Sequence, residues 1–327
     1  MRRLLLALSI LSPSLAVAQR VVPADTAAWT IVPQPQASLV YARDGSLIGE
    51  IGKEIRTSVS IRTLPRYLPQ AFVAVEDHRF YQHDGVDVVG IAGALKDNIF
   101  GERRGASTIT QQLVGNMHPT LIDRSDRSLG RKLDEQAAAR EMERHYSKEQ
   151  ILEAYLNQIS FGHGWYGVES AARHYFGKSA SKLSLAEAAA LAAMPKGPAL
   201  YDPLKYPDRV RQRRNIVLAL MADQGFITSA QAKAAQASSL VTQPNGGYSA
   251  YSPWYLDVVR IQATRAGIPV MQGGYRIYTG LDPVLQNAAV SALQEETAAL
   301  EADPDYAHPK YNPPKTPTRS SRATDYL

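Results

Sequence analysis

The chemistry that this chain could perform is concentrated around one glutamate. Glu76 directly follows the apolar run 71–75 and opens the segment EDHRFYQHDG at 76–85, which is dense in titratable groups. A carboxylate held against apolar walls loses hydration, and its pKa rises toward the range useful for proton transfer. A glutamate that only caps a helix or pairs with Arg79 is the plainer alternative, but the whole ordered segment favours a catalytic role.

Two later segments carry groups suited to sugar and phosphate oxygens. GASTITQQLV at 105–114 offers hydroxyls and amides, and Ser107 is also placed to cap the helix behind it. RKLDE at 131–135 spaces Arg131 and Glu135 so that both face one side of a helix. By residue type alone, RKLDE is more typical of an exposed, ion-paired helix face than of a binding site.

Helices must position these segments, because residues 64–235 have helical spacing almost throughout. Two capping boxes, S-x-x-Q and S-x-x-E, predict helices over 148–158 and 185–194. Another helix fits 208–223, with Gly225 as its stop signal. Its basic residues are interpreted as a solvated helix face: Arg209, Arg211, Arg213 and Arg214.

Shorter elements flank this helical region. SLVYARDGSLIGEIG at 38–52 predicts a β-hairpin with an Asp-Gly turn. Beyond residue 236, we expect a helix over 251–265, a strand and turn at 274–282, and a helix over 283–301. Residues 303–327 are rich in proline and poor in apolar groups, so we expect a disordered tail.

The composition of the chain limits where the protein can be located and what it can bind. The 327 residues include 36 basic and 31 acidic side chains, a net charge of +5 that does not argue for nucleic acid but suits lipid headgroups or a diphosphate. The chain has no cysteine, which excludes disulfide and thiolate chemistry. Residues 1–18 fit a signal peptide, with an uncleaved N-terminal anchor as the alternative. We therefore expect an exported protein, in the periplasm or at the outer face of the cytoplasmic membrane.

Five segments in this order resemble one known family. They are EDHRFYQHDG, GASTITQQLV, RKLDE, KEQILEAYLN at 148–157 and GWYGVESAARHYFGK at 164–178. Together they resemble glycosyltransferase family 51, the peptidoglycan glycosyltransferase module of class A penicillin-binding proteins, over roughly residues 38–235.

The resemblance implies a mainly α fold. We expect a lysozyme-like helical glycosyltransferase module with a small β hairpin before it and a short α/β linker remnant after it. The predicted divisions are a signal peptide or anchor at 1–18, a spacer and hairpin at 19–55, a glycosyltransferase domain at 56–235, a linker segment resembling the start of a transpeptidase module at 236–302, and a disordered tail at 303–327.

The resemblance also implies the reaction. Lipid II, the undecaprenyl-diphosphate-linked disaccharide pentapeptide, would be polymerised into glycan strands by inverting transfer. Glu76 falls on the family's catalytic glutamate and would act as general base, and Glu135 falls on its second glutamate, which handles the diphosphate or a metal. The residues expected to bind substrate are Asp77, Arg79, Phe80, His83, Ser107, Thr108, Gln111, Gln112, Arg131 and Lys132.

Partners and cofactors follow from the same resemblance. The implied partners are lipid II, the growing glycan strand, the membrane surface and cell-wall synthesis proteins that include a separate transpeptidase. No cofactor is obligatory, although Mg²⁺ or Mn²⁺ would suit a diphosphate substrate. The segment 87–100 carries an apolar stripe that fits either a core or, as the family implies, the bilayer. That stripe is Val88, Ile91, Leu95 and Ile99.

Two departures from the family pattern leave alternatives open. Gly115 stands where the family normally has a lysine, whose charge would stabilise the departing diphosphate. A nearby cation (Arg124, Arg127, Arg131 or Lys132) or a divalent ion would have to substitute. The motifs of a serine transpeptidase are missing, since the S-x-x-K at 179–182 has no companions, so transpeptidase activity is not expected. A weak or inactive lipid II-binding scaffold is therefore the first alternative, and a glycan-cleaving lysozyme-like enzyme the second.

Overall fold

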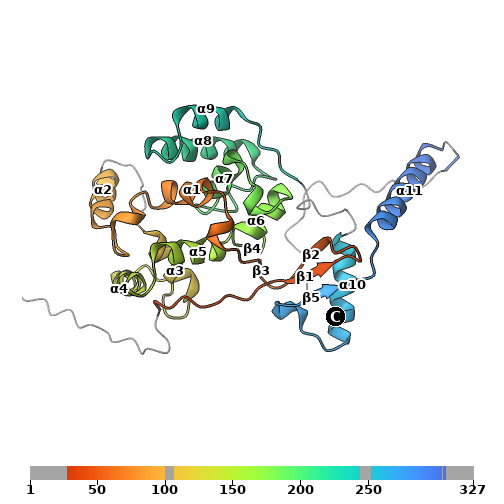
Figure 1. The fold of residues 1–327 in the computed structure, drawn as a ribbon, viewed down its shortest axis with the longest axis horizontal. Coiled ribbons are helices and arrows are strands. Elements are labelled where there is room, and N and C mark those ends of the chain that lie inside the picture. The colour runs from red at the N-terminus through yellow and green to blue at the C-terminus, as the bar shows by residue number, and fades with distance from the viewer. Residues whose placement is uncertain (1–27, 100–106, 244–251, 304, 307–327) are drawn as a thin grey trace, which may run out of the picture.

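The computed structural model describes residues 28–99, 107–243, 252–303 and 305–306, and it is mainly helical (Figure 1). The predicted signal peptide at 1–18 and most of the predicted tail lie outside the described residues. Within the described part, no helix is both long enough and apolar enough to cross a membrane.

An alanine-rich helix lies at the centre of the main core. All residues from Ala186 to Ala193 of α7 (Leu185–Ala193) are buried, and the small alanine side chains among them allow neighbouring helices to approach closely. α1 (Tyr67–Glu76) and α8 (Pro207–Asp223) pack directly on it. The same core takes side chains from α3 (Ile109–Met117), α4 (Leu129–His145), α5 (Lys148–Gln158), α6 (Val168–Phe176) and α9 (Ser229–Ala237).

Local capping signals set several of the helix starts. Both predicted capping boxes are present, at the starts of α5 and α7, so those two predictions are confirmed. The prediction that Ser107 caps the following helix is wrong. Thr108 has the extended backbone of a cap residue, and its side chain accepts a hydrogen bond from the Gln111 N–H.

A small sheet joins two distant parts of the chain. β1 (Ser38–Tyr41) and β2 (Leu47–Ile51) form the predicted hairpin, and β5 (Arg276–Tyr278) adds to β1 in parallel. α10 (Ser252–Arg265) packs on β2, where Leu256 lies so close to Gly49 that a Cβ there would be 2.5 Å from its Cδ1. A second, separate apolar cluster fills the space between the hairpin and the C-terminal segment.

Short parallel strands connect the hairpin to the helices. β3 (Ile55–Arg56) pairs with β4 (Trp165–Tyr166), and the fully buried Arg56 donates hydrogen bonds to the carbonyl oxygens of Asn157 and Pro35. α11 (Pro283–Ala302) extends away from both clusters and buries none of its side chains (Figure 1).

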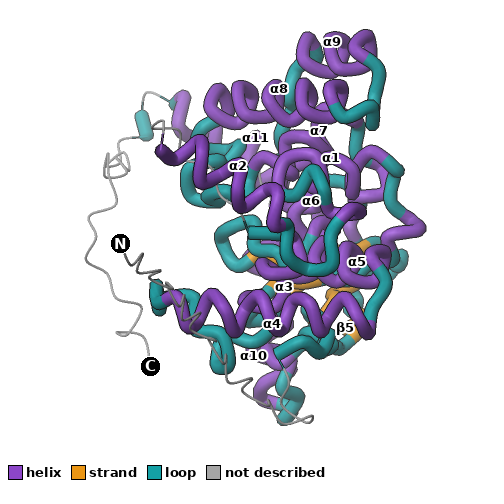
Figure 2. The backbone as a smooth tube through the Cα atoms, turned by 90° about the vertical axis from the view of Figure 1, so that its left-hand side faces the viewer, coloured by secondary structure: helices purple, strands orange, loops and turns teal. Residues whose placement is uncertain are grey.

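α2 (Val88–Ile99) and α4 lie at the edge of the helical body, and α4 runs alongside α3 (Figure 2). Val88, the first residue of the predicted apolar stripe, is 64% exposed, and its neighbour Val89 is 59% exposed. Val88 is therefore not part of a core, in contrast to one of the two interpretations of the stripe. Leu95 and Ile99 have side chains outside the described part.

Candidate active site

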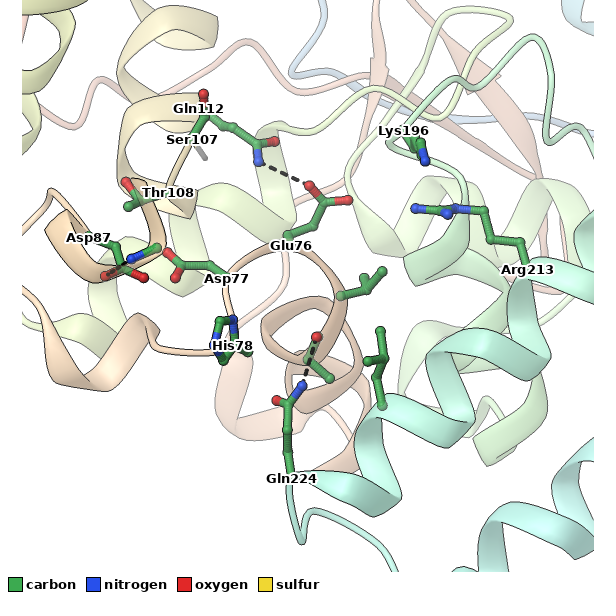
Figure 3. A pocket seen from close by; sticks show the side chains of 14 residues that line it. Glu76, Asp77, His78, Asp87, Ser107, Thr108, Gln112, Lys196, Arg213 and Gln224 are labelled. Carbon is green, nitrogen blue, oxygen red and sulfur yellow. Dashed lines mark hydrogen bonds between the residues drawn. The ribbon is translucent and has the colours of Figure 1, made fainter. Parts of the chain in front are cut away.

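A cavity of about 580 Å³ opens at the C-terminal end of α1. Its lining combines the end of α1 with the two residues after it (74–78), the start of α2, the residues that lead into α3, Lys196 after α7, and residues of α8. Figure 3 shows the side chains that converge there. The segments are far apart in the sequence, and helix packing alone brings them together.

Glu76 is the last residue of α1 and lines this cavity. The Gln112 side-chain amide donates a hydrogen bond to its Oε2, 3.0 Å away. Burial is the main cause that raises the pKa of Glu76, while Gln112 and the positive charges of Arg213 and Lys196 lower it in part. A carboxylate whose pKa is raised in this way is a stronger base than an exposed glutamate and is better suited to accepting a proton.

The amide of Gln112 is held in orientation by a buried tyrosine. The hydroxyl of Tyr155, which is fully buried on α5, donates to the Gln112 Oε1 over 3.3 Å. With its oxygen engaged there, Gln112 directs its NH₂ group toward Glu76. Gln112 is thus placed to hold the carboxylate of Glu76 in one position.

Asp77 couples the end of α1 to the start of α3. Its buried carboxylate accepts a hydrogen bond from the Ile109 backbone N–H at 3.0 Å and lies 3.1 Å from the His83 Nε2. Phe80 is fully buried, with the Lys148 ammonium over its ring. Asp77 lines the cavity, whereas Phe80 and His83 do not.

The glycine that ends EDHRFYQHDG allows a close backbone approach. Gly85 has a φ of +82°, and a Cβ there would lie 2.5 Å from the Ala139 carbonyl oxygen of α4. Its own carbonyl oxygen accepts hydrogen bonds from the Thr108 hydroxyl (2.8 Å) and the Gln111 side-chain amide (3.2 Å). Thr108, which also lines the cavity, is fixed in this way.

Arg79 forms an ion pair with Asp87 at the start of α2, with 3.2 Å between Nη2 and Oδ1. The Asp87 carboxylate also accepts the Gly90 N–H. Asp87 lines the cavity and Arg79 does not, so Arg79 holds one wall of the cavity in place.

Glu135 lies outside the lining of this cavity, in a cluster that borders it. Its carboxylate is only 4% exposed and pairs with Arg131 and Lys132. The Lys132 ammonium also donates to the Ser107 hydroxyl (3.1 Å) and to the Gln111 Oε1 (2.8 Å). Ser107 lines the cavity, so Lys132 links Glu135 to its rim. The interpretation of RKLDE as an exposed, ion-paired helix face therefore does not hold for Glu135, because its side chain is buried.

Two cations at the site were not predicted. Lys196, in the turn after α7, and Arg213, on α8, point toward Glu76 from the side opposite Gln112 (Figure 3). Arg213 also donates to the Ala193 carbonyl oxygen over 3.0 Å and stacks over the Tyr201 ring. No local pattern in the sequence marks a lysine that reaches another helix, so Lys196 could not be assigned to the site from sequence.

The interpretation of Arg209 to Arg214 as a solvated face is wrong for Arg213 and for Arg214. Arg214 is fully buried and donates to the carbonyl oxygens of Gln236 and Ser238. A signal was available, because Val210 and Val217 are four residues before and three after Arg214 and place it on the core face.

Side chains that commonly bind metal ions do not form a cluster within the described residues. No three His, Cys, Asp or Glu side chains gather in this part of the chain in a way that could hold one. Glu135, the predicted metal or diphosphate residue, already pairs with two cations. No chemical step is assigned to Mg²⁺ or Mn²⁺.

Comparison with known proteins gives a consistent result. Residues 44–222 match the family model described as Transglycosylase. The chain is 43% identical over 270 residues to penicillin-binding protein 1A of Aquifex aeolicus, covering 82% of this chain and 36% of that protein. It is 38% identical over 274 residues to penicillin-binding protein 1A of Escherichia coli, covering 83% and 32%.

A crystal structure of penicillin-binding protein 1A from Haemophilus influenzae also matches, with a TM-score of 0.42, 26% identity, and coverage of 82% of this chain and 30% of that one. The chain spans about a third of the length of the relatives it matches.

Proposed function

The chain belongs to the transglycosylase family, and we propose from this that it is a peptidoglycan glycosyltransferase that polymerises lipid II into glycan strands. The observation that carries the proposal is the state of Glu76. A carboxyl group with its pKa raised by burial, held by Gln112 at the wall of a 580 Å³ cavity, has the properties of a general base.

In the proposed reaction, Glu76 takes the proton from the 4-hydroxyl of the acceptor sugar. The oxygen then forms a bond to the anomeric carbon of the donor, and the bond from that carbon to the diphosphate breaks. Attack from the face opposite the leaving group inverts the configuration. Undecaprenyl diphosphate departs with the electron pair.

Lys196 and Arg213 have two roles in this proposal. Their positive charges lower the pKa of Glu76, which offsets part of the effect of burial and favours the deprotonated base. They also line the same cavity, where a cation stabilises the negative charge that develops on a departing diphosphate.

We assign the cluster around Glu135 to binding the donor. Arg131 and Lys132 supply cations, and Glu135 holds both in position through its ion pairs. Lys132 contacts Ser107 at the cavity rim, so a phosphate oxygen bound there could reach both groups. Thr108, Gln111 and Asp77 then act mainly by fixing the start of α3.

The substrate's lipid tail defines the location that we propose. Val88 and Val89 are exposed on α2, and Asp87 beside them lines the cavity, so an apolar surface adjoins the site. We infer that the protein works on the membrane surface, at the outer face of the cytoplasmic membrane or in the periplasm. Partners that supply transpeptidation belong to the same proposal.

A second candidate is a lipid II-binding scaffold with little or no catalytic activity. Gly115 favours it, because this position lacks the lysine found in the family. A glycan-cleaving enzyme that uses Glu76 as general acid is a third, weaker candidate. The products distinguish the three: chain growth, lipid II binding alone, or release of soluble fragments.

The test is polymerisation of labelled lipid II by the full chain in detergent, with Mg²⁺, with Mn²⁺ and with a chelator, and with Glu76→Gln as control. Chain growth that disappears in the control supports the enzyme. Lipid II binding without growth in any of the three conditions supports the scaffold. Neither binding nor growth contradicts both.

A further inference from the structure

A short loop between α5 and α6 is closed by hydrogen bonds within its own backbone. The Phe161 N–H donates to the Trp165 carbonyl oxygen over 2.8 Å, and the Trp165 N–H donates to the Gly162 carbonyl oxygen over 2.9 Å. The Trp165 ring also stacks on His174 of α6, with 4.4 Å between the ring centroids. These contacts fix the backbone of residues 161–165.

His163 lies within this loop in a backbone conformation that is uncommon for a residue with a Cβ. Its φ is +52°, and it is the only residue other than glycine with a positive φ in the part of the chain that the structure describes. The left-handed conformation costs free energy for such a residue, so it persists only where surrounding contacts hold the residue in place. The side chain of His163 makes one of these contacts.

That side chain hydrogen-bonds to a buried carboxylate. The His163 Nε2 lies 3.0 Å from the Oδ2 of Asp202, whose side chain is 2% exposed, whereas the His163 side chain is 44% exposed. Burial of Asp202 opposes its ionisation, but the hydrogen bonds from His163 and from the Leu204 N–H outweigh burial and lower the pKa of Asp202. A carboxylate can only accept a hydrogen bond, so His163 is the donor.

His174 of α6 also faces His163, with 6.4 Å between the ring centroids. Burial, together with the charge of His163, lowers the pKa of His174 to about 4. His174 is therefore neutral near neutral pH and supports the loop through its stack on Trp165. The hydrogen bond to Asp202 comes from His163.

Asp202 and Lys196 lie at the two ends of one hydrogen-bonded turn. The carbonyl oxygen of Gly197, the residue after Lys196, accepts the backbone N–H of Tyr201 over 3.0 Å. Tyr201 directly precedes Asp202. A contact that holds Asp202 in place therefore also limits the movement of Lys196.

The same turn supports the second cation of the site. The Arg213 guanidinium lies over the Tyr201 ring, with 5.1 Å between Cζ and the ring centroid. Lys196 and Arg213 both point toward Glu76 and lower its pKa (Figure 3). The position of one turn thus influences how both cations approach the proposed base.

We propose that His163 is a positioning residue of the glycosyltransferase, which acts by holding Asp202. Their hydrogen bond fixes the turn that aims two cations, Lys196 and Arg213, at Glu76. The inference rests on the proposed function, in which these cations lower the pKa of the base and stabilise the departing diphosphate. His163 does not line the cavity and is given no contact with the substrate.

The test is the pH–rate profile of lipid II polymerisation by the full chain, with the thermal midpoint measured alongside. His163→Gly removes the hydrogen bond but also the backbone strain, so the thermal midpoint should change little. With both cations less well placed, kcat should fall about 3- to 10-fold. The acidic limb should move to higher pH, because the pKa of Glu76 rises. Loss of folded protein alone would lower the rate without moving the limb.

His163→Gln tests the hydrogen bond itself. The glutamine amide can donate to Asp202, but the residue keeps the unfavourable backbone conformation. This variant should therefore have a lower thermal midpoint than His163→Gly and yet an acidic limb closer to that of the unaltered chain. A role confined to folding would instead make the less stable variant the less active one.

The matched control is His145→Gln. The His145 side chain is similarly exposed, at 47%, and its Nε2 lies 3.2 Å from the Glu141 carboxylate, but it belongs to α4 and has no part in the turn. Its acidic limb should stay at the pH of the unaltered chain.

Three results would each overturn the inference while polymerisation by the unaltered chain still supports the function. They are an unchanged limb in His163→Gly, an equal shift in His145→Gln, and no recovery of the limb in His163→Gln. If the unaltered chain does not polymerise lipid II at any pH, the proposed function fails and this inference fails with it.

Discussion

Burial, more than any single neighbour, sets the proton affinity of Glu76. The carboxyl group closes α1 against apolar side chains, and the hydrogen bond from Gln112 with the two cations offsets only part of the effect. The same burial that suits Glu76 to proton transfer makes its charged form costly to the folded state.

Glu76→Gln should therefore abolish activity and stabilise the fold. Loss of a general base costs about 10²- to 10⁴-fold in rate. The pKa of Glu76 is higher in the folded than in the unfolded chain. The contribution of this carboxyl group to stability is therefore lost as the pH rises from the unfolded-state pKa through the folded-state pKa. The gain in thermal midpoint from Glu76→Gln should be larger at pH 8 than at pH 4; an equal gain at both would contradict this account.

Arg213→Gln should shift the pH dependence of polymerisation. Arg213 lowers the pKa of Glu76, so its removal raises that pKa further. Glu76 then stays protonated up to a higher pH, so the acidic limb of the pH–rate profile moves to higher pH. The control is Arg211→Gln, which removes an exposed arginine of α8 paired with Asp208. An acidic limb that stays at its wild-type pH in Arg213→Gln would contradict this role of Arg213.

Sequence patterns locate the helices and turns whose ends are fixed by residues close in the chain. α5 and α7 begin at their predicted capping boxes, and the β1–β2 hairpin turns where an Asp-Gly pair was expected. The register of Arg214 in α8 was missed, because four arginines within six residues were read as one face.

Arg214→Met should destabilise the helical body. The fully buried guanidinium donates to two carbonyl oxygens at the C-terminal end of α9, so methionine would leave those acceptors unpaired. We expect a loss of about 2–4 kcal/mol in the free energy of unfolding, measured with urea. Arg211→Met, on the exposed face of the same helix, should change it little, and similar values for both would refute the assignment.

At the scale of the molecule, two apolar clusters divide the described residues. The larger contains the helices that build the site, and the smaller joins the β1–β2 hairpin to α10 and β5. The hairpin thus packs with residues more than two hundred positions away, although it precedes the helical region in sequence. The predicted domain limits of 19–55 and 236–302 separate segments that share this cluster.

Val270→Asp should loosen the smaller cluster alone. Val270 is 1% exposed there, and a buried carboxylate without a partner is costly. Amide hydrogen exchange should become faster in residues 38–51 and stay slow in α7. Val284→Asp, at a 76% exposed position on α11, is the control and should change neither region. Equal acceleration in α7 would mean that the two clusters unfold together.

Short-range patterns in the sequence were enough to identify the family, most helix limits and the groups around Glu76, because capping boxes, turns and ordered motifs depend on residues close in the chain. Only tertiary structure could decide that Lys196 and Arg213 face Glu76, that Glu135 is buried between two cations, and that Arg124 lies over Gly115. These contacts join residues from different helices and loops, and side-chain packing, which no local pattern records, determines which of them meet.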